Sequence, residues 1–301
     1  MTFATGGFHG LSYVPEVTMG TTPTTPSMKS FRHTSCSLGL SKESFQSNEL
    51  RSDRQVSDLR HGAKKVEGEI AFELSYGAFD DLLEAALFAT WATDVLKAGT
   101  TYKSFTMERR FTDISQYQVF TGVLVDSMSL NINPNGMITG SFGLVGMGTS
   151  LAGTSLGTPA AAAANSPFDG FGGSLEEGGV AMAAISAITL ELQNSLDPFF
   201  AVGSDSAVGI TAGRCVVNGT VTAAFQNTTL LNKFIAETES SLRVGISDPL
   251  GNELEIFLPR IKYSGGDIPA QNEGRILMNM PFTALLDSVS ATNIQLTRTP
   301  A

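Results

Sequence analysis

The chain has 301 residues, of which 42% are hydrophobic and 16% charged, and its formal net charge is −10. A chain of this length can bury a substantial core, and the negative balance argues against a protein that grips nucleic acid, which carries a basic patch or stripe. No uncharged apolar stretch reaches the roughly 20 residues of a membrane helix, so we expect no membrane insertion. The N-terminal MTFATGGFHG has neither a basic region nor an apolar run, so we also expect no secretory signal.

Residues 1–30 are rich in Thr, Gly and Pro and include TTPTTPSM. Proline lacks a backbone N–H and clashes inside a helix, so this segment cannot be a helix interior. We expect an extended arm over 1–30. A disordered tail and an arm packed on a neighbouring subunit are the two alternatives.

A short strand is predicted at 35–40, and the polar stretch 42–65 has no sustained apolar period, so we expect a long loop there. In the strand that follows, KKVEGEIAFEL, apolar residues and glycine alternate with glutamates. Successive side chains of a strand point to opposite faces. Glu67, Glu69 and Glu73 therefore share one face, where like charges repel.

One helix and three strands are predicted next. FDDLLEAALFAT at 79–90 has helical apolar spacing and early aspartates, which the helix dipole favours. Asn-Gly in NPNGM is a strong hairpin turn signal between the last two strands. The strands are expected at 104–111, 119–132 and 137–147.

Gly, Ala, Ser and Thr dominate 149–184, which we expect to be a linker or surface loop. From 187 the order of elements repeats that of the first half, with VNGTVTAAF at 217–225 matching VEGEIAFEL at 66–74. Each matched strand leads into a helix with a Leu-Leu pair, at 82–83 and at 230–231. We infer an internal duplication. The expected second-half elements are strands at 187–193, 215–225, 242–247, 253–263 and 274–282, with a helix at 228–237.

The residues 17–90, from TMGTTPTTPSMKSFRHTS through SKESFQSNELRSDRQVSDLRHGAKKVEGEIAFELSYGAFDDLLEAAL, resemble the tail tube (major tail) proteins of long non-contractile-tailed bacteriophages. The resemblance extends with less specificity to about 147, and it reaches the second half only through the repeat. It implies a mainly β chain of two tandem β-sandwich or barrel-like tail-tube units, each with a flanking helix. The expected division is an arm at 1–30, unit 1 at 31–148, a linker at 149–184, unit 2 at 185–288 and a C-terminal tail at 289–301.

The resemblance further implies a structural virion protein, assembled in the host cytoplasm, whose rings stack into the channel for genome ejection. Its partners would be copies of itself and the tape measure, terminator and distal tail proteins, with double-stranded DNA passing without specific binding. Two units in one chain suggest a homotrimeric, pseudo-hexameric ring; a hexamer is the alternative. A tail terminator or adaptor ring, the tube of a contractile injection system and a soluble β-sandwich binding module are alternative functions.

An acidic strand face suits the wall of a channel, because it repels DNA, which carries about one negative charge per 1.7 Å of axis. The alternative is an ordinary solvated outer face. Basic and acidic residues between 42 and 65 suit salt bridges to an adjacent ring, although exposed pairs contribute only about 0–1 kcal/mol each. The lumen-facing candidates are Glu67, Glu69, Glu73 and Glu191, and the inter-ring candidates are Arg51, Asp53, Arg54, Asp58, Arg60, Lys64 and Lys65.

No enzyme is expected, because no nucleophile–base–orienter set can be assembled from these residues. Walker A, G-x-S-x-G and H-E-x-x-H motifs are absent. His33 and Cys36 have a metal-like spacing without a second pair, so we expect neither a metal nor another cofactor. Cys36 and Cys215 are expected to be reduced thiols.

Overall fold

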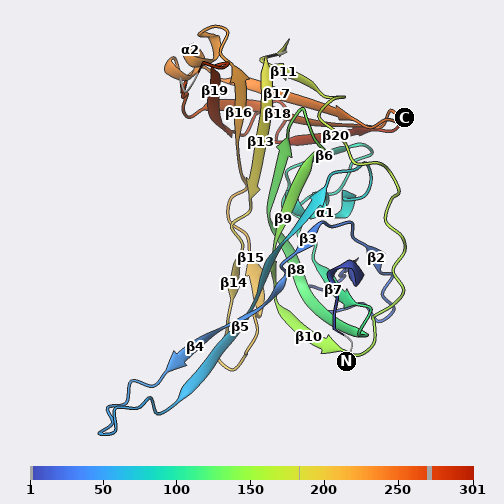
Figure 1. The fold of residues 1–301 in the computed structure, drawn as a ribbon, viewed down its shortest axis with the longest axis vertical. Helices are drawn as coiled ribbons and strands as arrows, with labels where there is room; N and C mark the ends of the chain where they lie inside the picture. The colour runs from blue at the N-terminus through green and yellow to red at the C-terminus, as the bar shows by residue number, and fades with distance from the viewer. Residues whose placement is uncertain (1–2, 183, 270–272) are drawn as a thin grey trace.

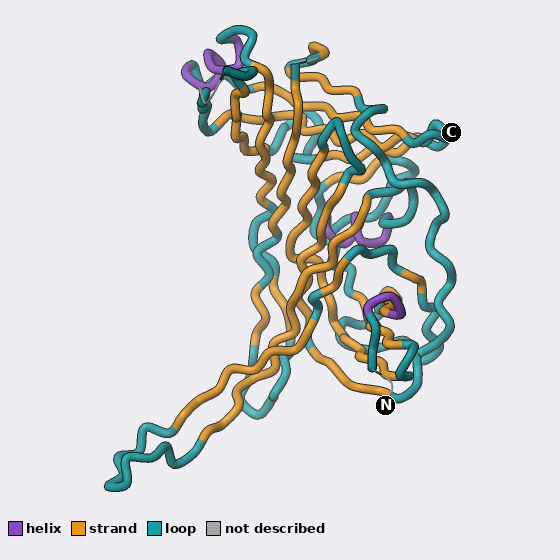
Figure 2. Tube along the Cα trace, viewed as in Figure 1, coloured by secondary structure: helices purple, strands orange, loops and turns teal. Residues whose placement is uncertain are grey.

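The computed structural model describes residues 3–182, 184–269 and 273–301. The molecule is built mainly of antiparallel strands with two short helices, which confirms the predicted fold class. Several long strands run along its long axis, and one hairpin projects well beyond the body (Figures 1 and 2).

Two sheets form the first half. In one, β1 (His9–Pro15) pairs with β7 (Phe105–Phe111), which pairs with β8 (Gln116–Ile132), and β8 pairs with β10 (Gly148–Ala152). In the other, β5 pairs with β9, and β9 pairs with the second part of β8. The remaining bounds are β2 (Lys29–Ser30), β3 (Ser35–Cys36), β4 (Gly39–Gln46), β5 (Leu59–Glu73), β6 (Val95–Lys97) and β9 (Thr139–Gly146). Both β3 and β4 pair with the free side of β5.

The second half repeats this pairing pattern. β17 pairs with β11 and β18, and β18 also pairs with β20. β16 pairs with β13 on one side and β19 on the other, and β19 pairs with the end of β18. The bounds are β11 (Ser174–Glu177), β12 (Val180–Ala181), β13 (Ile185–Gln193), β14 (Asp197–Phe199), β15 (Gly209–Thr211), β16 (Val216–Ala224), β17 (Ser240–Ser247), β18 (Glu253–Tyr263), β19 (Leu277–Ala284) and β20 (Gln295–Thr299).

Strand pairs join the halves at two places. β13 pairs with the second part of β8, from Ile188 opposite Ile132 to Gln193 opposite Ser127. β20 pairs with β6 of the first half. A single sheet therefore runs through both halves in the order β5–β9–β8–β13–β16–β19.

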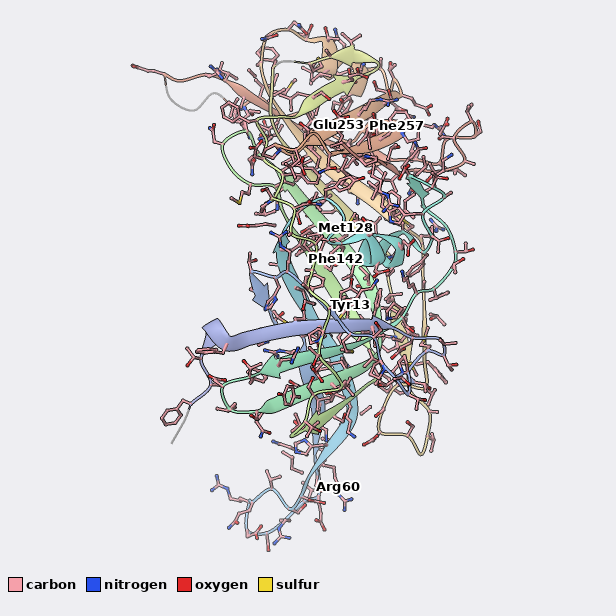
Figure 3. All side chains as sticks on the ribbon, turned by 90° about the vertical axis from the view of Figure 1, so that its right-hand side faces the viewer. Tyr13, Arg60, Met128, Phe142, Glu253 and Phe257 are labelled. Carbon is pink, nitrogen blue, oxygen red and sulfur yellow. The ribbon has the colours of Figure 1, made fainter. Side chains whose placement is uncertain are left out.

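Each half has one helix that follows the strand with the V-x-G pattern. α1 (Asp80–Leu87) buries its Leu and Ala side chains, and its end is marked by Phe88 in the left-handed region. α2 (Thr229–Ile235) is shorter and buries only Leu230. The core beside α1 is aromatic, with Phe72 stacked on Phe142 at 4.6 Å between ring centroids (Figure 3 labels Phe142 and Met128).

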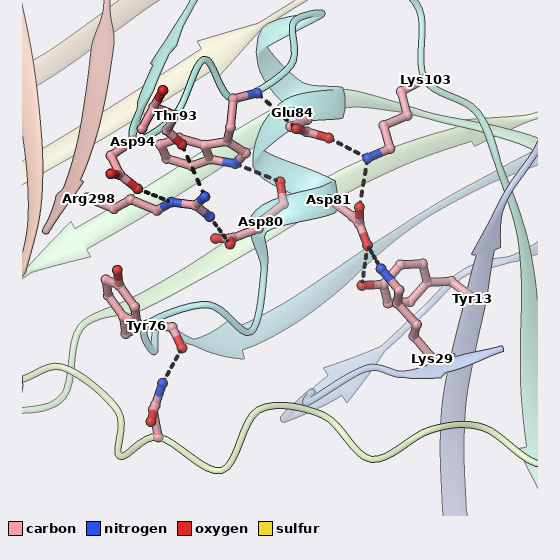
Figure 4. Close-up of polar contacts among 12 residues, drawn as sticks. Tyr13, Lys29, Tyr76, Asp80, Asp81, Glu84, Thr93, Asp94, Lys103 and Arg298 are labelled. Carbon is pink, nitrogen blue, oxygen red and sulfur yellow. Dashed lines mark hydrogen bonds and ion pairs between the residues drawn. The ribbon is translucent and has the colours of Figure 1, made fainter. Parts of the chain in front are cut away.

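A cluster of charged groups around α1 ties distant segments together (Figure 4). Asp81 accepts hydrogen bonds from Lys29 (2.6 Å) and Lys103 (2.7 Å). Arg298 of β20 pairs with Asp80, the first residue of α1. Burial raises the pKa of Asp81, but the bonds from Lys103 and Lys29 outweigh it and hold that pKa below its usual 3.8. The ion pairs thus link β20 of the second half to the first-half helix.

Several segments are more ordered than the sequence analysis predicts. Half of the expected loop at 42–65 is strand, because β4 continues to Gln46 and β5 starts at Leu59. The expected arm at 1–30 contains β1, whose central residues are buried against β7. Likewise, the expected linker contains β10 and β11, and the expected C-terminal tail contains β20. These segments become ordered because they pair with antiparallel strands from other parts of the sequence. Local composition does not reveal such partners.

Candidate functional surfaces

One face of the sheet that runs through both halves is polar and accessible. We call this the polar sheet face. The opposite face is core: Val66, Ile70, Phe142, Leu190 and Val221 are all buried. Because side chains alternate along each strand, the polar and apolar faces continue from strand to strand. Glu69 of β5, Gly143 of β9, Ser127 of β8 and Gln193 of β13 are successive neighbours in one row across the sheet. The uncharged polar residues of this face are Ser127, Ser129, Asn131, Thr139, Ser141, Thr189, Gln193, Asn218, Thr220, Thr222, Asn279 and Thr283.

The structure brings all four lumen-facing candidates onto this one face. Glu67, Glu69 and Glu191 are exposed, and Glu73 is half-buried. Glu191 lies opposite Ser129 of β8, so β8 and β9 separate it from the glutamates of β5. No lysine or arginine lies on this face within the paired segments 66–73, 127–132, 139–146, 188–193, 216–224 and 277–284, all of which the structure describes.

Asp267 adds a further carboxylate that the sequence analysis missed. It forms a bridge with Asn279 of the polar sheet face, on the side away from β16. No period or motif marks it, because the segment around it is a short glycine-containing loop in sequence. A basic group lies at the same border: Lys262 of β18 lies opposite Thr283, and its ammonium nitrogen is 3.7 Å from a carboxylate oxygen of Glu237.

A long hairpin made by β4 and β5 projects from the body and ends in a loop at 47–58 (Figure 1). It carries the inter-ring candidates, and Arg60 lies far out on it in Figure 3. Most of these charges are paired within the same chain: Arg51 with Asp53 at 2.8 Å, and Arg60 with Asp58 at 3.2 Å. Lys65 pairs with Glu43, Lys64 pairs with Asp205 at 2.5 Å, and Arg54 lies in the loop with a positive φ of 60°.

The hairpin also carries exposed apolar side chains, which the sequence pattern did not predict. Leu50 is 100% exposed, and Phe45, Val56 and Leu59 are also exposed. Their neighbours in the sequence are charged, so composition does not mark them, and only the projecting geometry shows that the described part of the chain leaves them exposed. Large apolar side chains that stay in contact with water mark an interaction surface when they cluster.

The described residues offer little for catalysis or metal binding. Among them, no group of three or more His, Cys, Asp and Glu side chains could hold a metal ion. His9 Nδ1 and His33 Nε2 lie 2.9 Å apart, and burial, with Arg109 and His33 nearby, lowers the pKa of His9 to about 4. Cys36 and Cys215 are free, and burial raises the pKa of both thiols.

An apolar cavity of about 370 Å³ opens between β8, β11, β13 and β17, lined by residues such as Ile132, Met182 and Val244. Glu176 is the acidic group in its lining, and no histidine or cysteine accompanies it there. None of the described helices has the length and apolarity needed to cross a membrane.

Comparison with known proteins assigns this architecture to a family. The family model for phage tail tube protein matches residues 9–284, which cover both halves and the sheet that joins them. No protein of curated function matches the chain. The resemblance seen over 17–90 is therefore confirmed and extends through the second half. The chain belongs to the phage tail tube protein family, whose members are structural components of the phage tail.

Proposed function

We propose that this protein is the subunit of a phage tail tube in which three copies form a ring and rings stack around a bore lined by the polar sheet face. One observation carries the proposal: the sheet runs without a break through two halves of like topology, and the charged side chains on the accessible face of its paired segments 66–73, 127–132, 139–146, 188–193, 216–224 and 277–284 are glutamates. Three chains with two units each give a ring of pseudo-sixfold symmetry. A hexamer of the whole chain would double the number of units.

The acidic face suits transit of DNA. A basic wall would bind the phosphates, because each cation that neutralises a phosphate releases a counterion. A carboxylate wall repels the duplex, and at physiological salt the repulsion acts within about 8 Å of the wall. Glu67, Glu69, Glu73 and Glu191 would therefore keep DNA away from the wall without hindering it at the centre.

The projecting hairpin would join one ring to the next, with Leu50 and Val56 buried on the adjacent ring. Burial of an apolar side chain contributes about 1.5–3 kcal/mol, more than an exposed ion pair does. In the virion the tube would meet the tape measure, terminator and distal tail proteins after assembly in the host cytoplasm. A terminator ring is the second candidate, and it predicts one ring per virion instead of many.

Electron microscopy of the purified chain and of two lumen variants tests the proposal. We expect rings or tubes with a central bore for the wild type and for the triple variants Glu67→Lys/Glu69→Lys/Glu73→Lys and Glu67→Gln/Glu69→Gln/Glu73→Gln. In phage carrying these variants, the lysine triple should impair DNA delivery strongly and the glutamine triple only weakly, since glutamine removes repulsion without adding attraction.

The matched glutamine triple keeps side-chain size, so a defect shared equally by both variants would point to packing. A wild-type protein that stays monomeric at every concentration would overturn the proposal. Normal DNA delivery by the lysine triple would remove these glutamates from the bore.

A further inference from the structure

Within the sheet that runs through both halves, the described residues of the two halves meet at one junction, formed by β13 and β8. Gln193 lies opposite Ser127, Glu191 opposite Ser129 and Leu190 opposite Leu130. The chain just after β13 continues the contact, because the Asn194 backbone N–H donates to the carbonyl of Asp126 at 2.7 Å. The Asn194 amide also donates to the carbonyl of Ala86 in α1 at 2.9 Å.

Both partners of this junction have counterparts elsewhere in the chain. β3 and β4 pair with β5 as β13 pairs with β16: Cys36 and Leu40 lie opposite Ile70 and Val66, as Ile188 and Leu192 lie opposite Val221 and Val217. Residues 36–41 therefore correspond to 188–193.

The other partner, the end of β8, corresponds to the segment that follows β18. Val125 pairs with Leu144 and Tyr263 pairs with Phe282, and both registers then shift by one residue. After the shift, Ser129 lies opposite Ser141, and Asp267 lies opposite Asn279. Residues 264–268 thus correspond to 126–130.

These two counterparts are the open ends of the sheet. Within the described residues, β3 and β4 pair only with β5, and 264–268 bond only to β19. Unpaired strand edges invite pairing with another chain. Both ends have the same backbone pattern as a junction that the chain already makes.

Exposure differs between the halves where a partner is missing. Leu192 is 1% exposed in the junction, whereas its counterpart Leu40 is 40% exposed. Aligned on their Leu-Leu pairs, α1 and α2 place Leu87 at the position of Ile235, and these are 2% and 68% exposed. Leu192 lies in the β13–β8 junction and Leu87 follows Ala86, whose carbonyl accepts from Asn194, and the counterparts of both leucines are accessible at the open ends.

We propose that the β3–β4 edge of one copy pairs with residues 264–268 of a second copy in the register of the β13–β8 junction, and that this contact buries Leu40 and Ile235. The inference rests on the proposed ring and specifies how its subunits join. Gly39 then lies opposite Asp267 of the second copy, as Glu191 lies opposite Ser129 within the chain.

The register also assigns a role to Lys42, the counterpart of Asn194. Its ammonium group reaches the last turn of the neighbouring α2, where the carbonyl of Phe234 corresponds to that of Ala86. Cations are favourable at helix C-termini because the negative end of the helix dipole lies there, and the Phe234 carbonyl, which accepts the Glu237 N–H at 3.1 Å, has a second lone pair for the ammonium group. The second copy is thus recognised by backbone pairing, two apolar side chains and one charge.

Disulfide trapping tests the register. In a Cys36→Ser/Cys215→Ser background, Gly39→Cys/Asp267→Cys should give covalent dimers and trimers when assembled rings are oxidised. Glu191→Cys/Ser129→Cys is the positive control and should give an intramolecular bond. Gly39→Cys/Ser264→Cys lies three residues out of register, roughly 10 Å away, and should not cross-link.

Ile235→Asp tests the helix contact. The monomer should keep its thermal stability, because Ile235 is exposed there, while the concentration needed for ring assembly should rise about tenfold or more, as loss of 1.4 kcal/mol predicts. Leu151→Asp is the matched control: Leu151 is 81% exposed on β10, in the other sheet, and rings should form normally.

The outcomes separate the inference from the proposed function. Rings that form without the Gly39–Asp267 cross-link would overturn this junction and leave the tube subunit standing. Normal assembly of Ile235→Asp would overturn the contact at α2. A wild-type chain that never assembles would overturn the proposed function and this inference together.

Discussion

At the residue scale, two glycines at matching positions of the halves hold strands close together. A Cβ on Gly219 of β16 would lie 2.4 Å from the carbonyl oxygen of Thr189 and 2.5 Å from the Phe282 ring. A Cβ on Gly68 of β5 would lie 2.4 Å from the Leu38 backbone. The V-x-G pattern that revealed the repeat therefore reflects a packing requirement of the same strand in each half, β5 and β16.

Gly219→Ala should destabilise the fold by about 1–3 kcal/mol, because the added methyl group forces shifts in a packed sheet. Urea denaturation of the monomer measures the effect. Gly209→Ala is the control, since a Cβ there meets nothing within 4 Å. Equal stability of the two variants would contradict the packing argument.

At the element scale, α1 is fixed by charges as well as by its apolar face. Asp81 has two lysine partners from separate segments, Lys29 and Lys103, and the Tyr13 hydroxyl donates to it at 3.2 Å. The counterpart α2 has a different anchor: Lys233 bonds to the buried Glu177 at 2.7 Å. The sequence shows a helix in both places, but it does not show which partners hold each one.

Asp81→Asn should lower the free energy of unfolding at pH 7 by about 1–3 kcal/mol, because two lysines lose a charged partner. The folded-state pKa of Asp81 is below 3.8, so its contribution is full above that value and is lost as pH falls through the folded-state pKa. The difference between variant and wild type should therefore shrink in strong acid.

Denaturation series at several pH values measure this dependence. Asp58→Asn is the control, because Asp58 and its partner Arg60 are both largely exposed, and it should change stability by under about 1 kcal/mol at any pH. If the difference in free energy of unfolding between Asp81→Asn and the wild type stays constant through the acid range, the ionised carboxylate of Asp81 is not the cause of that difference.

At the scale of the whole molecule, the body and the projecting hairpin divide the contacts that a tube needs. The body carries the polar sheet face and the open end at 264–268, and the base of the hairpin together with β3 forms the other open end. The rest of the hairpin extends beyond the body (Figure 1), and it carries exposed apolar side chains such as Leu50 and Val56. Contacts within a ring and contacts between rings would then depend on separate residues.

Replacing residues 48–57 by Asn-Gly should leave folding and ring formation intact and abolish stacking into tubes. The Ser47 N–H donates to the Asp58 carbonyl at 2.9 Å, so a two-residue turn can close the hairpin there. Electron microscopy distinguishes single rings from tubes. Arg51→Ala/Asp53→Ala, which removes an exposed ion pair and spares Leu50, should still form tubes.

Much of this fold could be predicted from strand alternation and from the order of elements. The glutamate face at 66–74, the Asn-Gly hairpin and both helices follow from local patterns, and the structure places them as expected. β1, β10 and β20 could not be predicted, because each forms a strand only by pairing with strands from other parts of the sequence. Asp267, Leu40 and Ile235 were missed for the same reason: their significance depends on what lies beside them.

The pairing of β20 with both β18 and β6 bears on how the chain folds during synthesis. Residues 295–299 leave the ribosome after every other strand, yet they complete the sheet beside β6 and supply Arg298 to the helix of the first half. A first half without residues 295–299 would therefore lack the strand that pairs with β6 and the cation that pairs with Asp80.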